Sequence, residues 1–214
     1  YTDPMEGNKD GITVSSIFWA RGDQGSATNA QITNCQFLGI SGHGFTYSHA
    51  FGAQECFGNF VDGCDTGTYA EPIQFEQAPC YIHDNHYKNV GEGVQMTFHR
   101  TGKEAPWRFE HNRIELIGNH GAAVSFSGEP DNQNRPVVAA MTVIGNRITG
   151  PPGQSGIRIT NDHVTVGDLT VTDNTIDLPD RAREIVIDKG LILGTLLVQG
   201  NRHADGSPLR ANHP

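Results

Sequence analysis

The sequence predicts an all-β fold, a single-stranded right-handed parallel β-helix (a solenoid) of about seven coils. Three observations lead to this prediction: an asparagine motif that recurs about once per coil, an alternating strand that recurs in step with it, and turn-forming Gly, Asn and Asp residues between them. We expect one domain over residues 1–214, with repeats from about 10 to 202 and a polar C-terminal tail over 203–214.

The asparagine motif reads apolar, any residue, small or polar, Asn, any residue, apolar. Its six copies contain Asn59, Asn85, Asn112, Asn146, Asn174 and Asn201, and an earlier copy has Cys35 in the asparagine position. Asparagine tolerates the left-handed backbone conformation that a sharp corner needs. Stacked asparagine amides can also hydrogen-bond to each other along a ladder. We therefore expect one asparagine at the same corner of each coil.

The alternating strand has two apolar residues that face inward in each coil. These pairs are Ile12/Val14, Phe45/Tyr47, Ile73/Phe75, Met96/Phe98, Val124/Phe126, Ile157/Ile159 and Ile185/Ile187. One apolar face at a period of two is typical of half-buried strands. Insertions gather on the corner just after this strand, and long loops collected on one face of a solenoid usually form its binding face.

Composition excludes several classes of function. Fifteen Lys and Arg residues against 24 Asp and Glu residues give a net charge of −9, which argues against a nucleic-acid partner. No apolar run approaches the roughly 18 residues of a membrane helix. Four cysteines without a Cys-x-x-Cys pair predict neither a disulfide scaffold nor a zinc site. The first coil begins without a cap, so we expect a piece of a longer chain or a cap from a neighbouring subunit.

The candidate catalytic residues follow from the outward positions of the alternating strand. Stacked strands lie about 4.8 Å apart, so Glu76 and His99 should be direct neighbours, and Arg100 follows His99. A carboxylate, an imidazole and a guanidinium together suit acid–base chemistry. The alternative interpretation is an exposed Glu–His pair on a polar sheet face.

Further outward residues predict a lining that contacts substrate: Gln74, Glu71, Thr97, Ser125, Arg158 and His49. Small hydroxyl side chains suit a sugar-binding surface. Basic residues within 88–113 suggest a cationic groove that would suit a uronate polymer, although a solvated loop explains them equally well. We expect no resident metal or cofactor. Calcium stays open at one acidic segment, which has hard oxygen ligands but no recognisable loop pattern: Asp3, Glu6, Asn8 and Asp10.

The sequence resembles the pectate-lyase-like superfamily of right-handed parallel β-helices, through the repeated Asn-x-apolar corners over about 10–202. More narrowly, the segments 42–45, 71–76 and 81–85 look like bacterial and phage-borne β-helix proteins that act on polysaccharides. Such relatives often carry Glu-Ala-Ile-Gln-apolar-Asp, from which Pro72 and Glu76 depart. The Asp-Asp pair of polygalacturonase-type hydrolases and the strand-face Asp set of calcium-dependent lyases are missing. The resemblance therefore implies a substrate class and assigns no catalytic residue.

Together these observations predict an extracellular or phage-virion protein that cleaves or remodels a polysaccharide, as a lyase, an epimerase or a glycoside hydrolase. In a lyase or epimerase, His99 would abstract the proton, Glu76 would orient it, and Arg100 or Gln74 would stabilise the charge. In a hydrolase, Glu76 would need a second carboxylate, Glu71 or Asp84. A non-catalytic polysaccharide-binding or adhesin module and a structural segment of a larger assembly remain as alternatives, and the oligomeric state stays open.

Overall fold

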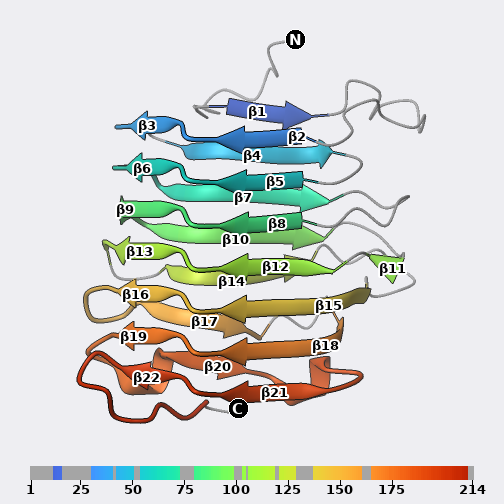
Figure 1. Cartoon of the computed structure of the whole chain (residues 1–214), viewed down its shortest axis with the longest axis vertical. Helices are drawn as coiled ribbons and strands as arrows, with labels where there is room; N and C mark the ends of the chain where they lie inside the picture. Colours follow the sequence, from blue (N-terminus) through green and yellow to red (C-terminus); the bar gives the residue numbers. More distant parts are fainter. Residues whose placement is uncertain are drawn as a thin grey trace.

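The computed structural model describes residues 12–15, 30–40, 42–50, 54–72, 80–98, 103–104, 106–118, 121–128, 137–160 and 165–211. Within these ranges the chain is an all-β parallel β-solenoid with three sheets, here called A, B and C (Figure 1). Sheet A contains, in spatial order, β1 (Ile12–Ser15), β4 (His43–Ala50), β7 (Thr66–Pro72), β10 (Glu92–Phe98), β14 (Ala122–Gly128), β17 (Ser155–Ile159) and β20 (Ile185–Ile187).

The other two sheets repeat the same order. Sheet B contains β2 (Ala30–Thr33), β5 (Gln54–Phe57), β8 (Cys80–His83), β12 (Trp107–Glu110), β15 (Val137–Ile144), β18 (Thr165–Thr172) and β21 (Leu196–Gln199), and β11 (Lys103–Glu104) pairs with β15. Sheet C contains β3 (Gln36–Leu38), β6 (Phe60–Asp62), β9 (His86–Val90), β13 (Arg113–Leu116), β16 (Arg147–Thr149), β19 (Thr175–Asp177) and β22 (Arg202–His203). The chain visits A, B and C in turn, and every strand pair between turns is parallel.

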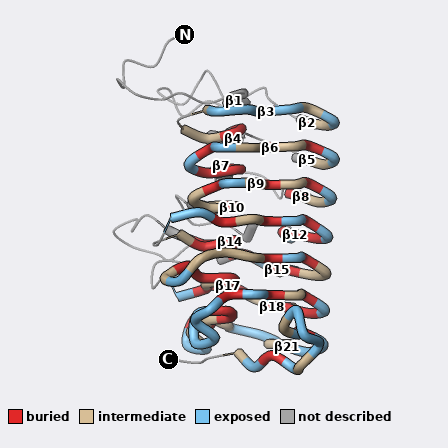
Figure 2. The backbone as a smooth tube through the Cα atoms, turned by 90° about the vertical axis from the view of Figure 1, so that its left-hand side faces the viewer, coloured by how far each residue is buried: buried red, intermediate tan, exposed pale blue. Residues whose placement is uncertain are grey.

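About five turns, from β4 through β19, form the regular part of the solenoid. Two short 3-10 helices follow β19, one before and one after β20: η2 (Arg181–Arg183) and η3 (Lys189–Leu191). Figure 2 shows these turns stacked along one axis, with buried segments recurring at matching places from turn to turn. The parallel solenoid that the repeats predict is therefore confirmed, with about five turns rather than the predicted seven coils.

The predicted asparagine ladder is present at the corner between sheets B and C. The side-chain Nδ2 of each asparagine donates to the Oδ1 of the next one at 2.9–3.1 Å, from Asn59 to Asn201. The backbone N–H of each asparagine donates to that same Oδ1. Cys35 keeps its place at the start, because its N–H donates to Asn59 Oδ1 at 2.9 Å. A buried amide thus satisfies polar groups of two turns at once.

The reason given for asparagine at this corner was partly wrong. None of the six ladder asparagines has a positive φ. The left-handed residue is the one immediately before the ladder position: Asn34, Gly58, Asp84, His111, Gly145, Asp173 and Gly200. The corner therefore divides two tasks between neighbouring residues. The first residue bends the backbone, and the asparagine is selected for its amide.

The core is a column of apolar residues from all three sheets, and it corrects the predicted strand register. Val124 pairs with Ile157, and Ile157 pairs with Ile185, as predicted. In β7, however, Thr68 and Ala70 lie opposite the inward residues of the neighbouring strands, and Ile73 and Phe75 lie outside the described residues. In β10 the inward pair that aligns with Val124/Phe126 is Val94/Met96, two residues earlier than predicted.

The described part of the C-terminal tail folds back over the last turn. Leu209 is buried in the core, and its N–H donates to the Asn201 carbonyl at 2.9 Å. A buried ion pair fastens this segment, since Glu184 is 1% exposed and its Oε1 lies 2.9 Å from His203 Nδ1. Residues 203–211 thus close one end of the solenoid, where an open edge would otherwise present unpaired backbone groups.

The pH dependence of stability should show the burial of Glu184. Burial raises the pKa of Glu184, against the opposing effects of His203 and Arg181. A raised folded-state pKa stabilises the fold fully below about pH 4.3, and the contribution is lost as pH rises through the folded pKa. Urea unfolding should therefore show wild type losing stability relative to Glu184→Gln as pH rises above about 4.3.

A carboxyl with the opposite shift provides the control. The hydrogen bond from His86 lowers the pKa of Glu115, so its contribution is present above about pH 4.3 and is lost as pH falls through the folded pKa. Glu115→Gln should therefore change the pH profile in the reverse direction. If wild type instead gains stability over Glu184→Gln as pH rises, the claim that burial raises the pKa of Glu184 is contradicted.

Candidate functional site at the corner between sheets A and B

The connections that lead from sheet A to sheet B differ most in length from turn to turn. They range from three residues (51–53) to fourteen (16–29), whereas each connection from B to C has two residues. One of them contains β11, which pairs with Val137 and Val138 of the next turn. This placement confirms that the insertions follow the alternating strand. The corner where the repeat varies most is the place where recognition can be built on a rigid frame.

Several predicted site residues lie on strands that lead to this corner. Backbone positions are described for His49 in β4, Glu71 in β7 and Thr97 in β10. Glu71 pairs with Ser48, and Thr97 pairs with Ser127. The remaining candidates of the predicted centre lie outside the described residues: Gln74, Glu76, His99 and Arg100.

The strand alignment used to place Glu76 beside His99 was wrong. That alignment set Ile73 opposite Met96, but Ala70 occupies this position. As a result Gln95, not Thr97, lies opposite Ser125. The alignment failed because a buried threonine, Thr68, takes an inward position that a search for apolar pairs passes over. The role of Glu76, His99 and Arg100 as a catalytic group stays a prediction.

Sheet A also presents described residues near the predicted lining. Gln95, Ser125 and Arg158 follow one another on adjacent strands. Ser125 is 4% exposed, and Arg158 is half-buried. Glu92 was not singled out from the sequence; burial raises its pKa, with Arg158 and His43 acting in the opposite direction. Glu92 is the first residue of β10, so it lies at the other end of this strand from the A–B corner and apart from the predicted centre.

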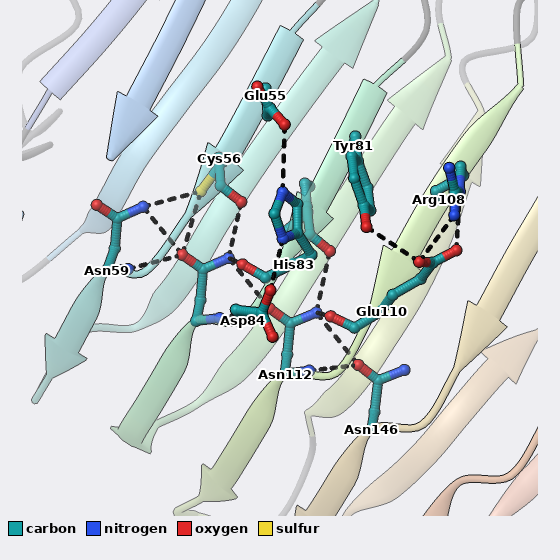
Figure 3. A network of polar contacts seen from close by, with 12 residues as sticks. Glu55, Cys56, Asn59, Tyr81, His83, Asp84, Arg108, Glu110, Asn112 and Asn146 are labelled. Carbon is teal, nitrogen blue, oxygen red and sulfur yellow. Dashed lines mark hydrogen bonds and ion pairs between the residues drawn. The ribbon is translucent and has the colours of Figure 1, made fainter. Parts of the chain in front are cut away.

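A polar network that was not predicted from the sequence lies on the outer face of sheet B and extends to the B–C corner (Figure 3). His83 lies at its centre, with Nδ1 2.7 Å from Asp84 Oδ2 and Nε2 3.3 Å from Glu55 Oε1. The Gln31 amide donates to the other Glu55 oxygen at 2.7 Å. Carboxylates only accept, so both contacts of His83 are hydrogen bonds together only when both ring nitrogens carry protons.

The neighbouring strand adds a second charged group. Arg108 donates to both oxygens of Glu110 at 2.8 and 3.0 Å, and the Tyr81 hydroxyl donates to Glu110 Oε2 at 3.1 Å. Burial and the Glu110 carboxylate raise the pKa of Tyr81. The hydrogen bond to Glu110 raises the pKa of Arg108. Glu110 is buried; the Arg108 guanidinium compensates its charge, and the Tyr81 hydroxyl adds a hydrogen bond.

Stacked planar groups hold this network in place. The His83 ring lies 3.9 Å from the Tyr81 ring and 4.9 Å from the Phe57 ring, nearly parallel to Phe57. The Arg108 guanidinium lies over the Tyr81 ring, 4.6 Å from its centre. Contacts of this kind fix side-chain orientation before any ligand arrives.

A sequence signal for this face did exist. Tyr81-Ile82-His83 and Arg108-Phe109-Glu110 each place two polar residues around one buried apolar residue, which is the outward pattern of a strand. The outward columns considered as a site were those of sheet A alone. Asp84 was considered as a partner for Glu76, but it lies at the B–C corner, at the other end of β8 from the A–B corner.

The predicted cationic groove is not formed by the described basic residues. Lys88 and Arg113 lie on sheet C, where their partners are Asp62 at 3.4 Å and Glu115 at 2.7 Å. Arg108 lies on sheet B and is paired with Glu110. The basic stretch 88–113 therefore divides between two faces, and its described charges are largely compensated.

Among the described residues, no group of three or more His, Cys, Asp or Glu side chains is placed to hold a metal ion. The acidic segment considered for calcium, residues 3–10, lies outside that part of the chain. Within the described ranges, no helix is long and apolar enough to cross a membrane. Comparison with protein-family models, with curated proteins and with solved structures found no match to this chain.

Proposed function

We propose that the chain is a carbohydrate-active, right-handed β-helix of the pectate-lyase-like kind, which cleaves or remodels an extracellular polysaccharide. The supporting observation is the outer face of sheet B, where carboxylate, imidazole, phenol and guanidinium groups lie on strands that follow the connections of most variable length. A polymer lying along this face would contact one turn after another. The setting proposed for this activity is extracellular or on a phage virion.

The proposed chemistry keeps the residues predicted from the sequence. In a lyase, His99 takes the proton beside the uronate carboxyl, the freed electron pair forms a C=C bond, and the glycosidic C–O bond breaks. Arg100 or Gln74 stabilises the transient charge, and Glu76 orients the base. Glu71, Thr97, Ser125, Arg158 and His49 are proposed to contact substrate. In a hydrolase, Glu76 acts together with a second carboxyl, for which Glu71 is the proposed residue.

The alternative is a polysaccharide-binding or adhesin module without turnover, or a structural segment of a larger assembly. One observation favours it: the charged groups of sheet B largely satisfy one another, as Arg108 and Glu110 do. Groups engaged in this way support recognition more readily than proton transfer.

The variant His99→Ala separates the enzyme from the binding module. For an enzyme, removal of the base should lower turnover by about 100- to 10,000-fold while polymer binding is retained. The measurement is initial product formation, together with retardation in a native gel that contains the same polymer. His86→Ala is the matched control, since His86 lies on sheet C and contacts Glu115. Equal turnover of wild type and His99→Ala would refute the assignment of the base.

A further inference from the structure

An in-register row of polar side chains runs along the solenoid axis on the outer face of sheet B. Its members are Gln31, Glu55, Tyr81, Arg108, Thr142 and Thr170, on six successive strands. The residue that follows each of them is buried, as the alternation of a strand requires: Ile32, Cys56, Ile82, Phe109, Val143 and Val171. With strands about 4.8 Å apart, the row spans about 24 Å.

The charged groups of this row already have partners within the sheet. Arg108 is paired with Glu110, and Glu55 contacts both Gln31 and His83. The remaining members offer amide, phenol and hydroxyl groups, and Arg108 keeps N–H donors beyond the two that it gives to Glu110. Since the whole chain carries a net charge of −9, an anionic polymer gains little at this face.

We infer that this row is a docking track for an uncharged polysaccharide, whose hydroxyl groups both donate and accept hydrogen bonds. The inference rests on the proposed function and narrows it to the hydrolase or the binding module, because the β-elimination of a lyase needs a uronate polymer. The stack of Phe57, His83, Tyr81 and Arg108 fixes the upper part of the track, so little side-chain freedom is lost on binding. The lower part, Thr142 and Thr170, supplies hydroxyl groups on adjacent strands.

The test compares polymers and variants by retardation in native gels containing either a neutral polysaccharide (a galactomannan or a β-glucan) or a uronate polymer (polygalacturonate or alginate). The double variant Thr142→Val, Thr170→Val removes two hydroxyl groups while keeping side-chain shape and strand preference. Thr149→Val, Thr175→Val is the matched control on the outer face of sheet C. Loss of two hydrogen bonds should raise the Kd for a neutral polymer about fivefold to 100-fold. The control should leave it unchanged.

Each outcome decides between the claims. Retardation by a neutral polymer that weakens only in the sheet B variant supports the track. Retardation by uronate polymers alone, or equal effects of the two double variants, overturns the track and leaves the proposed function standing. Absence of retardation and of product formation with every polymer of both classes overturns the track and the proposed function together. Urea unfolding of both double variants shows that the comparison concerns folded proteins.

Discussion

Asn146→Ala should lower the free energy of unfolding by about 2–5 kcal/mol. Asn146 Oδ1 accepts from the backbone N–H and the amide of Asn112 at 2.9 and 3.1 Å. Its Nδ2 donates to the carbonyl of Phe109 and to Asn174 Oδ1 at 3.1 and 2.9 Å. Alanine removes all four bonds inside a buried corner and takes away the acceptor of the Asn112 N–H. Urea unfolding followed by far-ultraviolet circular dichroism measures the loss.

The matched control removes an amide from the solvent-exposed start of sheet C. Gln36 is exposed on β3, so Gln36→Ala should change stability by no more than about 0.5 kcal/mol. A similar small change for Asn146→Ala would contradict the claim that the ladder fixes the B–C corner. A loss confined to Asn146→Ala would support it.

Gly67→Ala should also destabilise the fold strongly, by about 3 kcal/mol. A Cβ atom at Gly67 would overlap the ring of Tyr87 and lie 2.7 Å from the carbonyl oxygen of Gly93. The ring is fully buried, and its hydroxyl is held by Thr68 at 2.8 Å, so it has little room to move. The carbonyl belongs to the next strand of sheet A and cannot withdraw without disturbing the parallel pairing.

The control for Gly67 is an exposed glycine whose nearest neighbour is a side-chain oxygen, not a buried ring or a backbone carbonyl. At Gly190 the nearest atom to an added Cβ is a carboxylate oxygen of Asp188 at 3.2 Å, and the residue lies in η3. Gly190→Ala should therefore be nearly neutral in the same unfolding experiment. Equal stability of Gly67→Ala and wild type would contradict the close packing of Gly67 against Tyr87 and the Gly93 carbonyl.

Repetition made the solenoid predictable. The asparagine copies are spaced by a nearly constant length, and one amide can satisfy a neighbour only when successive turns lie directly above each other. The bending residue was harder to assign, because Gly58, Asp84 and His111 share little except the ability to adopt a positive φ. Because these residues differ in type, the position that bends the backbone does not stand out in the sequence. The asparagine does, because the same residue recurs in six copies.

The register of β7 could not be read from apolar spacing alone. Thr68 is fully buried, and its hydroxyl bonds to the Tyr87 hydroxyl of sheet C, a pairing between residues 19 positions apart. Such a contact is decided by packing in three dimensions. For the same reason the network around His83 escaped notice, since Glu55, Tyr81 and Arg108 come together only when three separate strands of sheet B are in register.

The measurement that tests the central claim most directly is a polysaccharide panel with the wild-type chain, followed both at 235 nm and by release of reducing ends. The account predicts product from at least one polymer. Absorbance growth would identify β-elimination and assign the chemistry to His99 and Arg100, whereas reducing ends without absorbance would identify hydrolysis and assign it to carboxyl groups such as Glu76 and Glu71. The absence of both signals with every neutral and uronate polymer would contradict the claim that the chain is a depolymerising enzyme.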